Sequence, residues 1–136
     1  MNNKEGLCYL AGFFDGEGSI GLYWNKAQKI YVPIIQVSNT NKTIIKELQD
    51  KFGGYVNSRQ RKASYKLIWD WNIRDGKKRI PYFIETMTPY LRQKKEEAKT
   101  LMEFCNTLTK GGKTITPKLQ AYRKKLAEEL KSLKRR

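Results

Sequence analysis

Residues 10–18 read LAGFFDGEG, which joins the apolar stripe of a helix to two acidic residues and closes on glycine. The pattern places Asp15 and Glu17 at the C-terminal end of a helix, where backbone carbonyls lack partners and the helix dipole is negative. Because two carboxylates and exposed carbonyls gather in one spot, the stretch predicts a bound cation.

Two glycines of the same stretch predict a close contact with another helix. Gly12 and Gly16 lie four residues apart, so they share one face of the helix. Together with Ala11 they leave that face almost bare of side chains. A second helix is therefore expected to pack against it.

The stretch resembles the signature motif of the LAGLIDADG homing endonucleases, present here in the form LAGFFDGEG. The alternative interpretation is a buried amphipathic helix that stops on glycine and carries two solvated acids. The motif occurs once in 136 residues, a length that suits one ordinary domain. The resemblance therefore implies one half of an active site per chain, which a second copy completes.

The charge balance points to a polyanionic partner. Lysine and arginine number 28 against 13 acidic residues, which gives a net charge of +15. Such an imbalance is costly in self-repulsion unless a polyanion such as DNA lies beside it. The sequence has no run of 18 apolar residues and no signal-like segment, so we expect a soluble, intracellular protein of a microbial cytoplasm or an organelle, with no membrane partner.

Histidine is absent, and the two cysteines, Cys8 and Cys105, lie in apolar helical patterns rather than at paired spacing. The sequence therefore excludes histidine-based zinc sites and histidine nucleases, and it predicts two core cysteines without a disulfide. Any metal must take oxygen ligands, which favours a hard ion such as Mg²⁺, or Mn²⁺.

Hydrophobic spacing predicts an alternation of helices and strands. We expect Gly16 and Gly18 to end the first helix, and Thr40 or Asn41 to cap the second. The predicted elements are a helix over 4–14, strands over 19–25 and 30–38, a helix to about residue 52, strands over 55–61 and 65–73, and helices over 79–88, 91–108 and 117–134.

This order predicts an α+β fold in which helices cover one face of a four-stranded antiparallel sheet. The open face suits the DNA major groove, which admits a two-stranded ribbon. The order also resembles the αββαββα LAGLIDADG endonuclease fold, with its saddle-shaped DNA-binding sheet, over about residues 7–108. We divide the chain into an endonuclease core, residues 1–109, and a basic C-terminal helical extension, residues 110–136.

The extension carries ten basic residues against two acidic ones and begins with a Lys/Gly linker at 110–113. We expect its apolar stripe to dock on the core and its basic side to lie near the DNA backbone. The stripe consists of Leu119, Tyr122, Leu126, Leu130 and Leu133.

The resemblance implies catalytic roles for three positions. Glu17 stands where the family has its metal-binding acid and the Gly16 carbonyl matches a backbone ligand, whereas Asp15 is expected to support the helix end. Lys94, in the segment PYLRQK, aligns with the family's active-site lysine, although by itself it reads as a solvated basic helix start. Asn39 stands where some relatives have a water-ordering glutamine, and it is equally suited to cap the next helix.

Strand parity selects side chains for the open face. Ile30, Val32 and Ile34 share the parity of Gln36, so either apolar side chains contact thymine methyls or a bulge shifts the register. The predicted DNA-binding residues are Ser19, Gly21, Tyr23, Asn25, Lys26, Lys29, Gln36, Ser38, Asn57, Arg59, Arg61, Lys62, Lys66, Asp70 and Asn72. The predicted dimer interface is Leu10, Ala11, Gly12, Phe13, Asp15 and Gly16.

The sequence thus predicts a sequence-specific double-strand DNA endonuclease, acting as a homodimer on a long near-palindromic site with Mg²⁺ or Mn²⁺. The resemblance adds short 3′ overhangs and an origin in a mobile intron. The alternative is a non-cleaving binder of the same fold, either an intron RNA maturase or a DNA-binding regulator. Glu17 and Lys94 favour the enzyme, and Trp24, Trp69 and Trp71 are expected to face inward rather than to stack on RNA bases. A basic chromatin-type protein is a third hypothesis, but it needs no paired acids.

Overall fold

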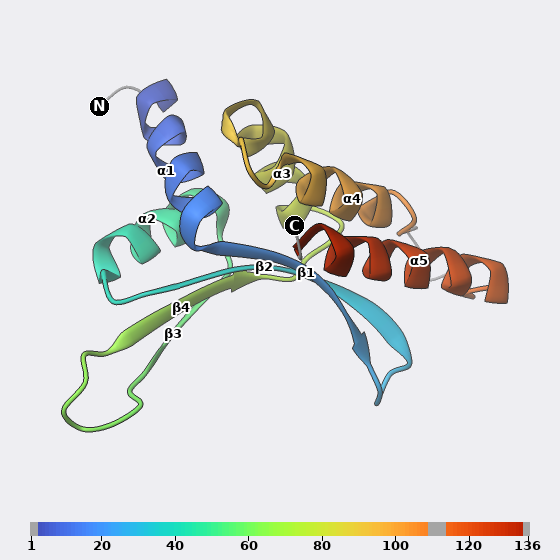
Figure 1. The fold of residues 1–136 in the computed structure, drawn as a ribbon, viewed down its shortest axis with the longest axis horizontal. Helices are drawn as coiled ribbons and strands as arrows, with labels where there is room; N and C mark the ends of the chain where they lie inside the picture. The colour runs from blue at the N-terminus through green and yellow to red at the C-terminus, as the bar shows by residue number, and fades with distance from the viewer. Residues whose placement is uncertain (1–2, 109–113, 135–136) are drawn as a thin grey trace.

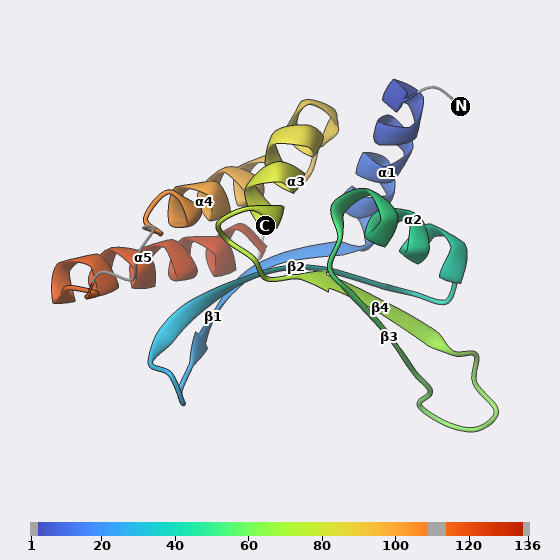
Figure 2. The ribbon, with the colours of Figure 1, turned by 180° about the vertical axis from the view of Figure 1, so that it is seen from behind.

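In the computed structural model, which describes residues 3–108 and 114–134, helices cover one face of a four-stranded antiparallel sheet and leave the other face open (Figure 1). The two hairpins curve away from the helices, so the sheet is saddle-shaped, as the view from behind also shows (Figure 2). The strand order is β1-β2-β4-β3. The elements are α1 (Asn3–Glu17), β1 (Gly18–Asn25), β2 (Ile30–Asn39), α2 (Lys42–Phe52), β3 (Tyr55–Arg59), β4 (Ile68–Ile73), α3 (Arg79–Met87), the 3-10 helix η1 (Thr88–Tyr90), α4 (Lys95–Cys105) and α5 (Pro117–Lys134). The predicted α+β order is confirmed.

The first helix is longer than the sequence predicts. It does not stop at Gly16 but continues to Glu17, and β1 begins at the next residue, Gly18. A Cβ atom on Gly18 would lie 2.2 Å from the ring of Phe14, so the chain can enter the strand over this ring only where no side chain is present. The sharp turn keeps Glu17 directly beside the sheet.

Two other boundaries differ from the predictions. Strand β3 ends at Arg59 and β4 starts at Ile68, because residues 60–67 form a loop that the side chain of Gln60 closes by donating hydrogen bonds to the carbonyls of Ala63 and Tyr65. The helix predicted over 91–108 begins only at Lys95. Residues 91–94 form an irregular segment before it, which Asp15 holds as described below.

The core lies between the sheet and the helices and centres on Phe83 of α3. The ring of Phe83 packs against Phe14 of α1, Phe52 of α2 and Trp71 of β4, with centroid distances of 5.0, 4.8 and 5.9 Å. Each of these four side chains is at most 3% exposed. Phe14 belongs to the LAGFFDGEG stretch, so the core fixes the helix end that carries the acidic residues.

The pairing of β1 with β2 shows whether a bulge shifts the apolar residues of β2 off the open face. The pairs run without interruption from Gly18 opposite Val37 to Asn25 opposite Ile30. No bulge shifts the strand, and Ile30, Val32 and Ile34 therefore share the open face with Gln36 and Ser38. The open face is apolar at this outer hairpin and polar near the middle of the sheet.

Helix α5 packs against α4 and along the edge strand β1 (Figure 1). Leu126 and Leu130 are buried as predicted, but Tyr122 is 41% exposed and Arg123 takes the buried position beside it. Arg123 donates to the hydroxyl and the carbonyl of Thr107 at 3.0 and 3.1 Å, and these hydrogen bonds offset the cost of burying its charge. The predicted linker at 110–113 lies outside the described residues.

Exposure corrects two more predictions. Cys105 is buried, but Cys8 lies exposed on α1. Trp71 is buried and Trp69 is partly buried, whereas Trp24 is 41% exposed because the β1–β2 hairpin curves away from α5. Among residues 3–108 and 114–134, none of the helices is both long and apolar enough to cross a membrane.

Candidate active site and nucleic-acid interface

Asp15 joins the end of α1 to the start of α4. Its carboxylate is 8% exposed and accepts hydrogen bonds from the backbone N–H groups of Arg92 and Lys94, at 2.7 and 3.1 Å. A carboxylate is favoured there because the N-terminal end of α4 presents unpaired N–H groups and a positive dipole. Each carboxylate oxygen of Asp15 accepts one backbone hydrogen bond, which fits the predicted supporting role at the helix end.

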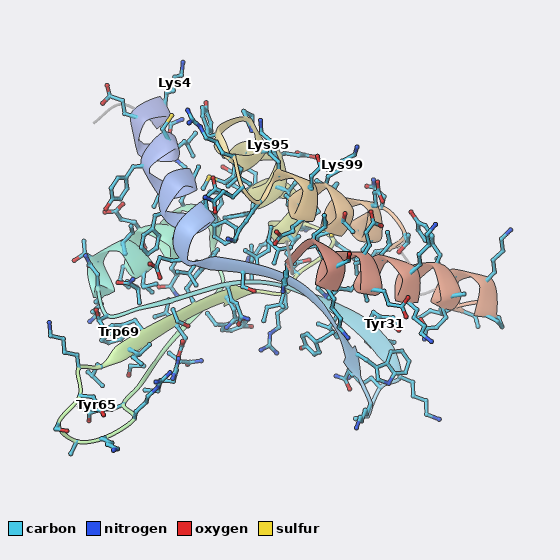
Figure 3. All side chains as sticks on the ribbon, viewed as in Figure 1. Lys4, Tyr31, Tyr65, Trp69, Lys95 and Lys99 are labelled. Carbon is cyan, nitrogen blue, oxygen red and sulfur yellow. The ribbon has the colours of Figure 1, made fainter. Side chains whose placement is uncertain are left out.

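Lys94 completes this connection from the other side. Its ammonium Nζ donates to the backbone carbonyl of Asp15 at 2.6 Å, at the negative end of the α1 dipole. The solvated-helix interpretation is thus wrong for Lys94, which is partly buried, but it describes the neighbouring Lys95, which is exposed on the outer side of α4 (Figure 3). The structure brings the predicted lysine to the predicted acidic helix end.

Glu17 is the last residue of α1 and its side chain is exposed. The last carbonyls of a helix have no partner within it, so the Gly16 carbonyl and the Glu17 carboxylate offer neighbouring oxygen ligands. Within the described chain, no three His, Cys, Asp or Glu residues gather into a metal site. This donor set suits a hard cation such as Mg²⁺, which commonly uses one or two carboxylates and keeps several waters or phosphate oxygens.

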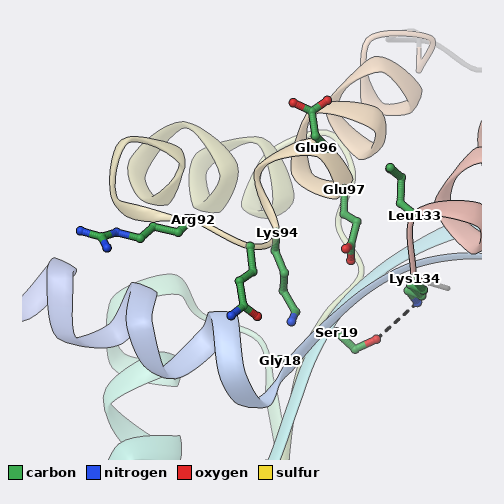
Figure 4. A pocket seen from close by; sticks show the side chains of 9 residues that line it. Gly18, Ser19, Arg92, Lys94, Glu96, Glu97, Leu133 and Lys134 are labelled. Carbon is green, nitrogen blue, oxygen red and sulfur yellow. Dashed lines mark hydrogen bonds between the residues drawn. The ribbon is translucent and has the colours of Figure 1, made fainter. Parts of the chain in front are cut away.

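A cleft of about 600 Å³ opens beside Lys94, between the start of α4 and the C-terminal end of α5 (Figure 4). Lys94 extends along it toward the end of α1, and Lys134 enters from α5 to contact the hydroxyl of Ser19 at 3.5 Å. The cleft is thus bounded by two lysines and by the first residues of β1. Its other lining residues are Gly18, Arg92, Gln93, Glu96, Glu97 and Leu133.

Asn39 lies at the end of β2, next to the strand positions that pair with the start of β1. Its side-chain oxygen accepts a hydrogen bond from the N–H of Asn41 at 2.8 Å and so shapes the turn before α2. Asn41, not Asn39, caps the helix, since it accepts from the N–H groups of Thr43 and Ile44. The capping alternative for Asn39 is therefore wrong, and its role toward water stays a prediction.

Polar side chains form cross-strand rows on the open face. Ser19 pairs with Gln36, Gln36 with Asn72, and Asn72 with Tyr55, which spans all four strands. Amide and hydroxyl groups in such a row can bond to base edges in the major groove. Sequence reasoning missed Tyr55, which is 69% exposed, although its parity with Asn57 is a signal that would have found it.

A second row on this face is held by Asp70 of β4. Its carboxylate accepts a hydrogen bond from the hydroxyl of Ser38 and forms an ion pair with the Nε of Arg59 at 2.8 Å. Asn57 pairs with Asp70 from β3. Three of the predicted DNA-binding residues therefore form one connected group, in which Asp70 orients the other two side chains.

Gly21, Tyr23 and Asn25 lie on β1, and the other predicted DNA-binding residues lie at the ends of the two hairpins. Lys62 is in the 60–67 loop as predicted, with its Nζ 5.7 Å from the ring centre of Tyr65, whereas Arg61 and Lys66 are in this loop rather than in the predicted strands. Lys26 and Lys29 lie in the turn between β1 and β2. Both positions suit contacts to phosphates better than base reading. Lys134, which sequence reasoning did not single out, reaches the sheet only through the packing of α5.

The exposed face of α1 is narrower than the predicted interface. Leu10, Ala11 and Asp15 are 4%, 0% and 8% exposed because they face the core of the same chain. Gly12 and Gly16 are exposed, and a Cβ atom on either would meet nothing within 4 Å. The available surface, which we call the α1 face, consists of Cys8, Tyr9, Gly12, Phe13 and Gly16.

Comparison with known proteins gives one family and one fold. The model of the family described as LAGLIDADG endonuclease matches residues 10–108. The fold is similar to the homing endonuclease I-CvuI in complex with a DNA target, with a TM-score of 0.77 and 21% identity over 96% of this chain and 82% of that one. It is also similar to the archaeal intron-encoded homing endonuclease I-Vdi141I complexed with DNA, with a TM-score of 0.81 and 16% identity over 97% of this chain and 86% of that one. For the homing endonuclease I-TnaI, the TM-score is 0.73 and the identity 19%, over 95% of this chain and 93% of that one. No curated protein matches the chain.

Proposed function

The chain belongs to the LAGLIDADG endonuclease family, and from this premise we propose that it is a homodimeric, metal-dependent endonuclease that cleaves both strands of a specific DNA site. The observation that carries the proposal is the arrangement at the end of α1. Lys94 donates to the Asp15 carbonyl there, two residues before the exposed carboxylate of Glu17. An acid and a lysine beside an open, polar sheet face are the groups that phosphodiester hydrolysis requires.

In this proposal Glu17 and the carbonyl of Gly16 hold the divalent cation, Mg²⁺ or Mn²⁺. When bound, such a cation supplies charge relief for the phosphate and an activated water. An acid at the centre of a face that binds DNA opposes binding unless a cation neutralises it, so the exposed Glu17 supports this assignment in a chain of net charge +15.

The ammonium of Lys94 stabilises the negative charge that develops on the scissile phosphate. Asp15 fixes the backbone of Lys94, so the long side chain starts from a defined position and loses less entropy when it acts. Asn39 orients the attacking water through its amide group, whose oxygen also accepts from the N–H of Asn41.

Two copies of the chain meet through the α1 face. Because Gly12 and Gly16 present backbone rather than side chains, two helices can approach closely and bring the two Glu17 carboxylates together. A twofold axis through this contact places two sheets along the DNA, so the target is long and nearly palindromic. The resemblance adds cleavage with short 3′ overhangs.

The test is cleavage of a pooled DNA library with randomised sites in Mg²⁺, and then in Mn²⁺, by the wild type and by Glu17→Gln. Glu47→Gln, an exposed acid on α2, is the matched control. We expect site-specific double-strand cuts from the wild type and Glu47→Gln and none from Glu17→Gln. If the wild type binds one site but cuts in neither metal, the chain is a non-cleaving binder and the enzyme proposal fails.

A further inference from the structure

A groove runs along the outer edge of β1, between that strand and α5. It consists of three adjoining hollows of about 500, 230 and 300 Å³, each of which shares lining residues with the next. The first two share Trp24, Tyr31 and Lys124, and the second and third share Tyr23 and Lys131 among others. The third reaches Lys134, which also borders the cleft beside Lys94. The groove is therefore continuous from the hairpin to the candidate active site.

The outer end of the groove is aromatic. Trp24 is 41% exposed and its ring lies edge-to-face with that of Tyr31, with centroids 4.9 Å apart. Both residues share the strand parity of buried core positions, so they lie on the helix side of the sheet rather than on the open face. Figure 3 shows Tyr31 between the hairpin and α5. An accessible indole in a hollow of this kind is a stacking surface for a flat ring.

The same hollow contains a hydrogen-bond acceptor that lacks a donor. The amide nitrogen Nε2 of Gln120 donates to the carbonyl of Lys29 at 3.2 Å, which fixes which way the amide points. Its oxygen Oε1 is buried, and no donor among the described residues reaches it. Such an orphaned acceptor is costly. If the Gln120 side chain turns toward the hollow, an N–H group of a nucleobase can satisfy it.

The wall of the groove is basic. Lys124, Lys131 and Lys134 lie exposed on α5 and line successive hollows, spaced seven and three residues apart. On a helix this spacing corresponds to about 10.5 and 4.5 Å, which suits a row of contacts to a polynucleotide backbone. Glu128 is the acid that lines the middle hollow, and the lysines on either side of it keep the wall net positive.

From these features we infer that the β1–α5 groove binds a single strand of nucleic acid, with an unpaired base stacked on Trp24 and its phosphates on Lys124 and Lys131. Gln120 accepts an N–H of the base at Oε1 once its side chain turns outward. Since Trp24 and Tyr31 lie on the helix side of the sheet, the aromatic end stays accessible when a duplex covers the open face. The inference does not rest on cleavage activity.

The experiment measures binding of a fluorescein-labelled, unstructured oligonucleotide of roughly 12 nucleotides, as RNA and as DNA of the same sequence, by fluorescence anisotropy. Trp24→Leu removes the stacking surface, and we expect binding to weaken by roughly 5- to 150-fold. The double variant Lys124→Ala/Lys131→Ala is expected to reduce the slope of log K against log salt by about 1.4. Binding of either oligonucleotide with these effects supports the site.

Trp69→Leu is the matched control. Trp69 is also a partly exposed indole on the helix side, with Lys42 Nζ 4.7 Å from its ring centre, but it lies at the opposite end of the sheet, away from α5. We expect it to bind the oligonucleotide like the wild type. Thermal unfolding of each variant separates loss of fold from loss of the site.

Three results would overturn the inference. They are no binding of either oligonucleotide by the wild type, binding by Trp24→Leu that equals that of the wild type, and a loss of affinity in Trp69→Leu as large as that in Trp24→Leu. These binding readouts are independent of cleavage, so the failure of the proposed endonuclease activity would leave them interpretable.

Discussion

Asp15 and Lys94 hold each other through reciprocal contacts: the Asp15 carboxylate accepts from the Lys94 N–H at 3.1 Å, and the Lys94 ammonium donates to the Asp15 carbonyl at 2.6 Å. The two residues lie 79 positions apart in the sequence. Their contact joins the C-terminal end of α1 to the N-terminal end of α4, where opposite dipoles meet. The helix end that carries Glu17 is thus fixed by the lysine proposed to act beside it.

The first prediction concerns the ammonium of Lys94. Lys94→Met is expected to reduce the cleavage rate by roughly 100-fold or more while DNA affinity changes little, because charge stabilisation acts on the transition state. The measurement is single-turnover cleavage together with binding to the same DNA in Ca²⁺. Lys95→Met is the control, since Lys95 is exposed. Equal rate losses in both variants would contradict the assignment.

The second prediction separates the role of Asp15 from that of a metal ligand. Asp15→Asn keeps the size of the side chain but loses the charge that two backbone N–H groups contact. We expect the free energy of unfolding to fall by about 1–3 kcal/mol, measured by urea denaturation. Glu17→Gln, at an exposed residue, is expected to leave stability nearly unchanged. A stable Asp15→Asn protein would argue against the structural role.

The sequence predicted the features that depend on local patterns. The periodicities give the order of helices and strands, the acids at the end of α1 and the parity of Gln36, Asp70 and Asn72 on the open face. Lys94 was found through a motif resemblance alone, since its charge by itself indicates a solvated residue. Each of these signals lies within one element, where spacing determines which way a side chain points.

What the sequence could not predict depends on packing between distant elements. Asp15 was assigned to a dimer interface, but residues 92–94 cover it. Trp24 has inward parity yet is exposed, because the hairpin curves away from α5 and leaves a hollow between them. Arg123 reads as part of a basic surface, although it is buried against Thr107 and the ring of Phe104. A local sequence pattern does not show which residue from a distant part of the chain will pack against it.

The third prediction tests the α1 face. A Cβ atom on Gly12 would meet nothing within 4 Å among the described residues, and alanine favours a helix over glycine by about 1 kcal/mol. Gly12→Ala is therefore expected to stabilise the monomer, whereas the larger Gly12→Leu keeps two α1 helices apart. Sedimentation velocity is expected to show a dimer for the wild type and a monomer for Gly12→Leu.

Glu47→Leu is the control for this prediction. Glu47 is exposed on α2, a different helix, so the same leucine there adds an apolar side chain outside the α1 face. We expect the Glu47 variant to remain a dimer. A Gly12→Leu protein that stays dimeric and cleaves normally would exclude the α1 face as the interface.

The fourth prediction concerns specificity on the open face. Asp70 holds Ser38 and Arg59 and places a negative charge where phosphates would otherwise be attracted. Asp70→Asn is expected to raise affinity for non-cognate duplex and to lower the ratio of specific to non-specific binding, because Arg59 becomes free to contact any phosphate. Binding-site selection from a randomised library measures both. An unchanged site preference would contradict a positioning role for Asp70.

The last prediction uses the two cysteines as probes. Burial, together with the negative charge of Asp75, raises the pKa of the Cys105 thiol from 9.0 to about 12, whereas Cys8 is exposed on the α1 face. Since only the thiolate reacts, a disulfide reagent at pH 8 is expected to modify one cysteine per native chain, Cys8, and two after denaturation.

Because the pKa of Cys105 is higher in the folded than in the unfolded chain, Cys105 stabilises the fold below about pH 9, and this contribution is lost as pH rises from 9 toward 12. Cys105→Ala is expected to lose less free energy of unfolding over that pH range.

In the proposed dimer the α1 contact slows the reaction of Cys8 with the reagent, and Gly12→Leu restores the fast reaction. Rapid modification of Cys8 in a dimer would place the contact elsewhere.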